Sequence, residues 1–210
     1  MLKRLSLLFF LIVNAIAFGL EIDKNIIRDD LGNEIAIKKY NRIVILDPAV
    51  VETFYMIGAE DKITAIGKGS KTKIYPLEKT KKLKNIGHMV NLNFENVLEC
   101  NPDLVILNPM GSKTQEKLKS FKIPFIVNRA HNFDDILKNI EIYGKLTGKE
   151  ENANNLIMKN KNQLRKLIRK RYRYRKQSED LGASWCQSNG YRQEMKLEIR
   201  EGRAPHSSEG

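Results

Sequence analysis

Residues 42–67 read RIVILDPAVVETFYMIGAEDKITAIG, and this stretch alternates a strand, a helix and a second strand. Residues 42–46 (RIVIL) are an apolar, β-branched run, as expected for a strand that is covered on both faces. Asp47 suits the cap of the helix that follows, and Pro48 occupies its first position, where a missing N–H costs nothing. Residues 62–67 (KITAIG) are the second apolar run. Such a unit predicts two parallel strands joined by a helix.

The same alternation continues on both sides of this unit. Before it, two short runs flank the sequence DDLGN (residues 29–33), where Gly32 and Asn33 suit the positive φ of a hairpin turn. After it, further short apolar runs alternate with helical segments. The predicted strands are residues 26–28, 34–37, 42–46, 62–67, 85–87, 104–107 and 124–127. We therefore predict an α/β fold with a doubly wound, mainly parallel sheet and helices on both faces.

In such a sheet, ligands bind beyond the carboxyl ends of the strands. The segments expected there are Asp47 and residues 68–75, 88–91, 108–113 and 128–131. They are rich in Lys, Arg, His and Asn, so we predict a polar, cationic rim. The rim contains neither a nucleophile beside a general base nor a glycine-rich phosphate loop, and we therefore expect no catalytic activity.

Beyond the last strand, apolar residues recur at helical spacing from residue 132 to residue 168. Gly148 interrupts this run, so we predict a helix of roughly 25 to 35 residues with at most one bend. The second half of this helix reaches too far to pack on one small lobe. We expect it to lead to another lobe.

The composition changes abruptly at residue 169. The first 168 residues contain 22 Lys, 5 Arg and 22 Ile, whereas residues 169–210 contain 3 Lys, 7 Arg and 1 Ile. Three interpretations of this tail stay open: a basic, Tyr-interleaved arm for a nucleic acid or membrane surface, a disordered segment, and a sequence read out of frame. In each case we expect an irregular tail after the helix.

The first seventeen residues have the organisation of a secretory signal peptide. Lys3 and Arg4 precede an apolar run at residues 5–13, and small residues follow at positions 15–17. The run is too short to cross a bilayer. We predict cleavage near Ala17 and a periplasmic mature chain. The formal net charge of +12 is scattered rather than gathered with aromatic residues, so it does not predict nucleic-acid binding.

Residues 85–109 read NIGHMVNLNFENVLECNPDLVILNP, which closely resembles the N-lobe signature of periplasmic binding proteins for iron–siderophore, haem and cobalamin uptake. Residues 42–67 resemble the preceding strand–helix–strand unit of that family. Residues 133–157 (FDDILKNIEIYGKLTGKEENANNLI) are similar to its rigid interlobe helix. The resemblance extends over residues 26–168.

The resemblance implies a domain organisation. Residues 1–17 are the signal peptide, 18–131 the N-terminal binding lobe and 132–168 the interlobe helix, while 169–210 fall outside the match. The second lobe that the family needs has no counterpart, so we expect a truncated chain. Because half of a clamshell cannot enclose a ligand from two sides, we expect weak or absent binding by this chain alone.

The resemblance also implies roles for individual residues. Glu95 falls at the acidic residue that docks on an arginine pocket of the permease, and a carboxylate in the first turn of a helix suits that role. His88 falls where haem-binding relatives carry a ligating Tyr, and its imidazole is suited to complete the coordination of a chelated metal. The candidate ligand-binding residues are His88, Tyr75, Arg129, His131, Asn108 and Lys73. The alternatives are a simple first-turn glutamate, a loop histidine without a ligand and solvated lysines.

The function implied is that of the substrate-binding component of a bacterial ABC importer. Its transported ligand is a metal chelate, its partner is the importer permease, and it is expected to be a monomer without an intrinsic cofactor or a nucleic-acid partner. The alternative is a secreted basic adaptor that binds polyanions through the Arg- and Tyr-rich tail.

Overall fold

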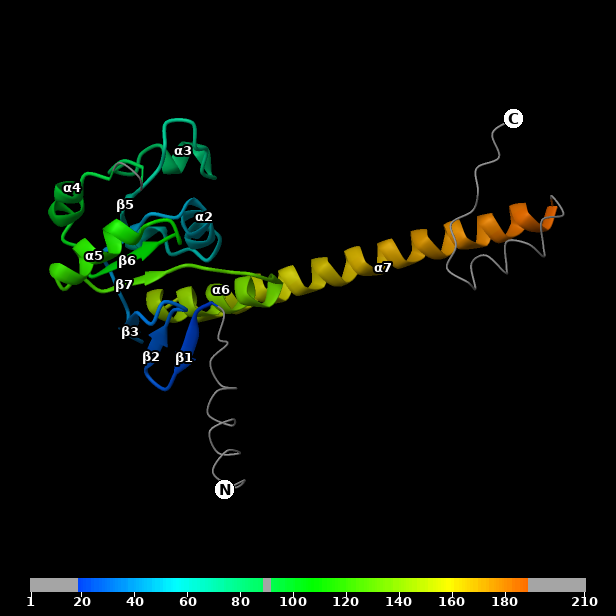
Figure 1. The fold of residues 1–210 in the computed structure, drawn as a ribbon, viewed down its shortest axis with the longest axis horizontal. Coiled ribbons are helices and arrows are strands. Elements are labelled where there is room, and N and C mark those ends of the chain that lie inside the picture. Colours follow the sequence, from blue (N-terminus) through cyan, green and yellow to red (C-terminus); the bar gives the residue numbers. More distant parts are fainter. Residues whose placement is uncertain (1–18, 89–91, 189–210) are drawn as a thin grey trace, which may run out of the picture. The chain divides into compact units, whose positions relative to one another are not determined.

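The computed structural model describes residues 19–88 and 92–188 (Figure 1). The predicted signal peptide lies outside these residues. The chain forms two compact units, one up to Lys159 and one from Asn160. The first unit contains an α/β lobe, and the lobe boundary at residue 131 stays a prediction.

A four-stranded parallel sheet forms the centre of this lobe. Its strands lie in the order β5-β4-β6-β7, and all three neighbouring pairs are parallel. Their bounds are β4 (Ile43–Ile45), β5 (Ile63–Ile66), β6 (Leu104–Leu107) and β7 (Phe125–Val127). The predicted fold class is confirmed.

The strand predicted at residues 85–87 is reduced to one parallel bridge between Ile66 and Asn85. Gly87 has a φ of 102°, outside the range of a strand. Only Ile86 in this run has a high strand propensity, which explains why the pairing does not continue.

A second, antiparallel sheet precedes the main one. It contains β1 (Glu21–Asp23), β2 (Ile26–Arg28) and β3 (Glu34–Ala36), so the predicted hairpin is confirmed and gains one strand. Gly32 has the predicted positive φ, 78°, but Asn33 does not. Instead, the Asn33 side-chain nitrogen donates to Asp29 Oδ2 at 2.9 Å.

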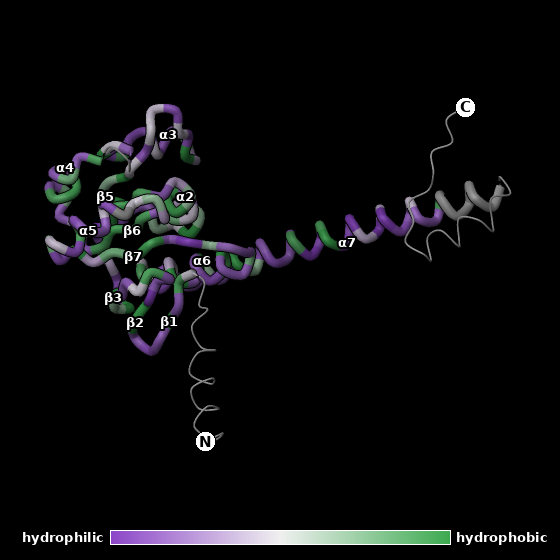
Figure 2. Tube along the Cα trace, viewed as in Figure 1, coloured by the Kyte–Doolittle hydropathy of each residue, from purple (hydrophilic) through white to green (hydrophobic). Residues whose placement is uncertain are grey.

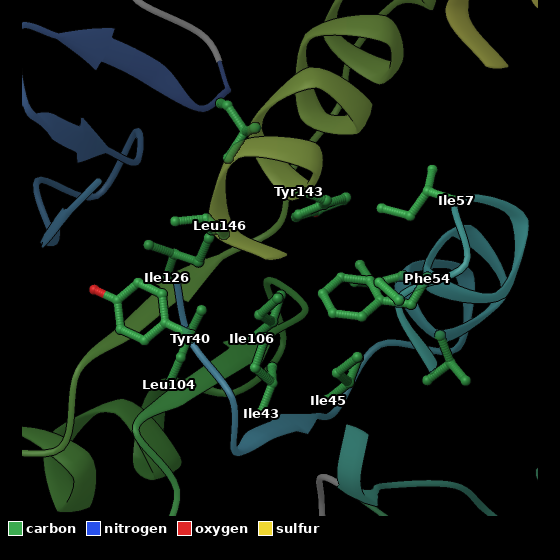
Figure 3. Packing of buried hydrophobic residues seen from close by; sticks show 14 of the residues in the cluster. Tyr40, Ile43, Ile45, Phe54, Ile57, Leu104, Ile106, Ile126, Tyr143 and Leu146 are labelled. Carbon is green, nitrogen blue, oxygen red and sulfur yellow. The ribbon is translucent and has the colours of Figure 1, made fainter. Parts of the chain in front are cut away.

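Helices cover both faces of the main sheet. Helices α2 (Pro48–Met56) and α6 (Phe133–Thr147) pack on one face, and α4 (Phe94–Glu99) and α5 (Ser112–Ser120) pack on the other. Short helices η1 (Glu60–Lys62) and α3 (Leu77–Thr80) lie in the connections. In Figure 3, Phe54 of α2 and Tyr143 of α6 lie over the strand residues Ile45 and Ile106. Neighbouring residues such as Val44 and Val105 belong to the core on the opposite face.

The helix starts follow the sequence signals. Asp47 Oδ1 accepts a hydrogen bond from the Ala49 N–H at 3.0 Å, and Pro48 is the first helical residue. Asn93 caps α4 and Asn132 caps α6 in the same way.

The helix predicted over residues 132–168 consists of two helices. Gly148 adopts a left-handed conformation (φ 70°) that ends α6, and α7 (Glu150–Ser188) begins two residues later. Because α7 continues to Ser188, the expectation of an irregular tail from residue 169 is wrong for 169–188. Residues 149–181 contain neither Gly nor Pro and many Lys, Arg and Gln, which favour a helix even without an apolar period. Residues 189–210 lie outside the described chain.

Within the described ranges, no helix combines the length and the hydropathy needed to cross a bilayer.

Candidate functional site

The main sheet contains a point at which the chain reverses its direction of winding. From β4 the chain moves outward to β5 and then returns to β6 on the other side of β4. The carboxyl ends of β4 and β6 therefore flank the usual ligand position in a sheet of this type. Strand β4 leads directly to Asp47, and β6 leads to Asn108.

Four polar side chains connect the elements around this position. Asn128, directly after β7, donates through Nδ2 to Asp47 Oδ2 at 2.8 Å. The Tyr143 hydroxyl and Asn139 Nδ2, both on α6, donate to Asn128 Oδ1 at 2.6 and 2.9 Å. Because β6 lies between β4 and β7, this network spans the carboxyl end of β6 and fixes the rim to α6.

The sequence interpretation did not identify this network. Asn128 lies in the rim segment 128–131 without a predicted role, and Tyr143 lies within the helical run predicted over residues 132–168. The one sequence feature that points to this network is Asn139, a polar residue between Ile136 and Ile140 in the helical run. It is buried, and buried polar groups are normally hydrogen-bonded.

Tyr143 makes the stability of the lobe sensitive to alkaline pH. Burial raises the pKa of Tyr143 well above its ordinary value, and the nearby Asp47 carboxylate raises it further. The unfolded chain ionises this residue near pH 10, whereas the folded chain keeps it neutral. Its contribution to the free energy of unfolding is therefore fully present below about pH 10 and is lost as the pH rises.

We expect Tyr143→Phe to lessen the loss of stability above about pH 10 and to cost about 1 kcal/mol at neutral pH through the lost hydrogen bond. Part of the alkaline loss should remain, because burial also raises the pKa values of Tyr40 and Tyr55. Urea unfolding at neutral and alkaline pH measures both effects, with Tyr174→Phe on the exposed part of α7 as the control. An unchanged alkaline loss in Tyr143→Phe contradicts this account.

A pocket of about 410 Å³ lies beside the network, between α2 and α6. Its walls are mainly apolar and include Ala49 and Val50 of α2, Ile136 and Ile140 of α6, and Pro109 after β6. Of the six candidate ligand-binding residues, Arg129 lines this pocket.

Arg129 is already engaged in an ion pair. Its Nη1 atom lies 2.6 Å from Asp30 Oδ2, and the Asp30 side chain is only 7% exposed. The guanidinium group thus joins the rim to the β2–β3 hairpin. A ligand carboxylate at this position has to share Arg129 with Asp30.

The other candidate residues lie at different points of the rim. His88, Tyr75 and Lys73 are exposed on the β5 side, where the His88 ring borders Gly69. His131 is exposed on the loop after β7, and its backbone N–H donates to Asp135 Oδ2 at 2.8 Å. Asn108 lies between the two sides, half-buried, with its side-chain oxygen accepting from the Met110 N–H at 2.9 Å. Since β5 and β7 are the two edges of the sheet, these residues do not share one small pocket.

Among the residues that the structure describes, no group of three or more His, Cys, Asp or Glu side chains is arranged to hold a metal ion. The role predicted for His88 is a different one, a single imidazole added to a metal that a chelate already holds. That role stays a prediction.

Glu95 lies in the first turn of α4, on the other face of the sheet from α2 and α6. Its side chain is exposed, and its backbone N–H donates to Asn93 Oδ1 at 3.0 Å. An exposed carboxylate at this place is accessible to an arginine of another protein. Docking itself stays a prediction.

Comparison with known protein families identifies the family of this chain. The profile of the periplasmic binding protein family matches residues 43–179, from the start of β4 into α7. This chain belongs to the periplasmic binding protein family. The match continues past residue 168, where the resemblance was expected to end.

Two curated transport proteins are similar in sequence to this periplasmic binding protein. It is 33% identical over 149 residues to the uncharacterized ABC transporter substrate-binding lipoprotein YvrC of Bacillus subtilis, and the match covers 68% of this chain and 46% of the relative. It is also 33% identical over 102 residues to the vitamin B12-binding protein of Vibrio parahaemolyticus, covering 48% of this chain and 36% of the relative. The chain thus spans less than half the length of these curated relatives.

The lobe is also similar to solved structures. A possible iron-binding, periplasmic solute-binding protein of Staphylococcus epidermidis superposes with a TM-score of 0.56 and 26% identity, covering 63% of this chain and 52% of that one. Coverage of about half of a two-lobe protein fits the predicted N-terminal lobe. The resemblance to metal-chelate-binding relatives is confirmed.

Proposed function

We propose that this periplasmic binding protein contributes the N-terminal lobe of the substrate-binding component of a bacterial ABC importer for a metal chelate. The chelate classes are iron–siderophore complexes, haem, cobalamin and nickel complexes. The observation that carries the proposal is the polar rim at the winding reversal between β4 and β6. The names of the relatives, an ABC transporter lipoprotein, vitamin B12-binding proteins and an iron-binding protein, support it.

The spacing of the rim residues suits a large ligand. Lys73, Tyr75 and His88 follow one edge of the sheet, whereas Arg129 and His131 follow the other. Three strand spacings separate these edges, about 14 Å. A multidentate chelate bridges such a distance, with His88 on its metal and Arg129 on an anionic group, while Asn108 lies between them.

Two further features belong to this proposal. The chain is exported by its N-terminal signal, is cleaved near Ala17 and acts as a monomer. Glu95 presents a carboxylate to the permease from the face of the sheet that α4 covers.

Titration of the purified full chain with ferric siderophores, haem, cobalamin and nickel–histidine tests the function. We expect one class to bind with a dissociation constant weaker than about 1 µM, because one lobe leaves part of the ligand in water. The double variant His88→Ala, Arg129→Ala should weaken that binding at least about fivefold, since it removes one contact from each side of the rim. The control is Lys82→Gln, an exposed change outside the rim segments.

The other outcomes are equally informative. If none of these chelates binds at millimolar concentration, the proposed contacts of His88 and Arg129 with a chelate are wrong. Binding well below 1 µM shows that a single lobe suffices, which contradicts the expectation of an incomplete site.

A further inference from the structure

We propose that residues 161–181 of α7 bind the surface of bilayers that contain anionic phospholipids. Every residue in this segment is exposed. The segment contains nine Lys and Arg residues against two acidic residues, Glu179 and Asp180, a net charge of +7. Within 161–181 the structure contains one ion pair, between Arg175 Nε and Glu179 Oε1 at 3.5 Å. The cationic charge of the segment is therefore largely uncompensated.

The same segment exposes a group of large apolar side chains. Leu164, Leu167 and Ile168 lie at positions i, i+3 and i+4, so they share one face of the helix. They are 37%, 63% and 58% exposed. Figure 2 shows hydrophobic bands within the otherwise hydrophilic helix α7. Tyr172 and Tyr174 follow within two turns, each 61% exposed.

The strongest cationic cluster lies on the other side of the helix. Lys166, Arg169, Lys170 and Arg173 have the spacing i, i+3, i+4 and i+7 and line one shallow surface. Over residues 164–168 the helix carries Leu and Ile on one face and Lys and Arg around the remainder, and Arg171 continues the apolar face one turn later. A short apolar face within a strongly basic helix is typical of segments that lie in a membrane interface. Long basic side chains reach the headgroups from the flanks of such a helix.

The apolar face favours a bilayer over a nucleic acid. Contact with a phosphate backbone uses the cations but leaves Leu164, Leu167 and Ile168 in water. At a bilayer surface these side chains enter the boundary of the acyl region, and tyrosines are enriched at this depth. The sequence left open an adaptor that binds polyanions through this part of the chain. The proposal specifies an anionic bilayer as that polyanion, and it does not depend on chelate binding by the lobe.

Co-sedimentation of the full chain with vesicles tests the proposal. We expect binding to mixed phosphatidylglycerol–phosphatidylcholine vesicles, little binding to phosphatidylcholine alone, and weaker binding as salt is raised. The variant Lys166→Gln, Arg169→Gln, Arg173→Gln should lose about tenfold in affinity, and so should Leu167→Ser, Ile168→Ser. The matched control Lys71→Gln, Lys82→Gln, Lys113→Gln removes the same charge from exposed lobe positions and should leave affinity unchanged.

Three results overturn the proposal. One is the absence of binding to anionic vesicles at low salt. The second is an equal loss in the lobe control, which shows that net charge alone is responsible. The third is an unchanged affinity of Leu167→Ser, Ile168→Ser together with tighter binding to duplex DNA than to vesicles, which assigns the segment to a nucleic acid.

Discussion

Replacing Asp29 with Ala is expected to lower the free energy of unfolding by about 3–5 kcal/mol. The Asp29 carboxylate is almost fully buried at the tip of the β2–β3 hairpin. Its Oδ1 atom accepts from the backbone N–H groups of Leu31 and Asn33 at 3.0 and 2.9 Å. Its Oδ2 atom accepts from Asn33 Nδ2 and from the Val127 N–H, both at 2.9 Å. Truncation leaves all four donors without this acceptor.

The conservative change Asp29→Asn should lower the free energy of unfolding nearly as much. The asparagine NH₂ group cannot accept the hydrogen bonds that one of the two carboxylate oxygens accepts. Urea unfolding measures both variants, and Asp134→Asn, at an exposed position in the first turn of α6, is the control. A loss of less than about 1 kcal/mol in Asp29→Asn would falsify the account of this carboxylate.

Faster amide exchange at residues 127–131 is also expected in the Asp29 variants, because Asp29 and the Asp30–Arg129 ion pair both hold the hairpin to this part of the rim.

Gly144→Ala is expected to destabilise the lobe by about 2–3 kcal/mol. At an open helical position the same change stabilises by about 1 kcal/mol. At Gly144, however, a Cβ atom would lie 2.6 Å from Ala153 Cβ and 3.2 Å from Glu150 Cα. The second neighbour is backbone, so α6 and the start of α7 have to move apart.

A double variant separates this steric clash from other effects. Ala153→Gly removes the nearest contact. Adding Gly144→Ala to the Ala153→Gly variant should therefore cost less stability than adding it to the wild type. Thermal and urea unfolding of the four proteins complete the cycle. An increase in stability for Gly144→Ala alone is incompatible with the close approach of the two helices.

The sequence predicted those parts of the fold that depend on local signals. Asp47 and Pro48 start α2 where expected, and Gly148 ends α6, because capping and left-handed turns are specified within a few residues. The parallel sheet followed from its apolar runs. The run at residues 85–87 failed as a strand because Asn85 and Gly87 surround its single isoleucine.

The parts that could not be predicted depend on partners far apart in sequence. Nothing near Arg129 indicates that its guanidinium pairs with Asp30, and nothing near Tyr143 indicates a hydrogen bond to Asn128. The helical continuation of α7 was missed for another reason. An exposed helix needs no apolar period, so the loss of periodicity after residue 168 was not a sign of irregular structure.

The central claim is that a metal chelate binds at the carboxyl ends of β4 to β7. Backbone NMR of the full chain with a bound paramagnetic ferric chelate tests it most directly, because amide signals near the iron broaden. The account predicts broadening at Asp47, at residues 68–75, at His88 and along 108–110 and 128–131. Signals at the opposite, amino end of the sheet, such as Asn101 and Asp103, should stay sharp. Broadening centred on the amino end, or on residues 161–181 instead of the rim, would contradict the account.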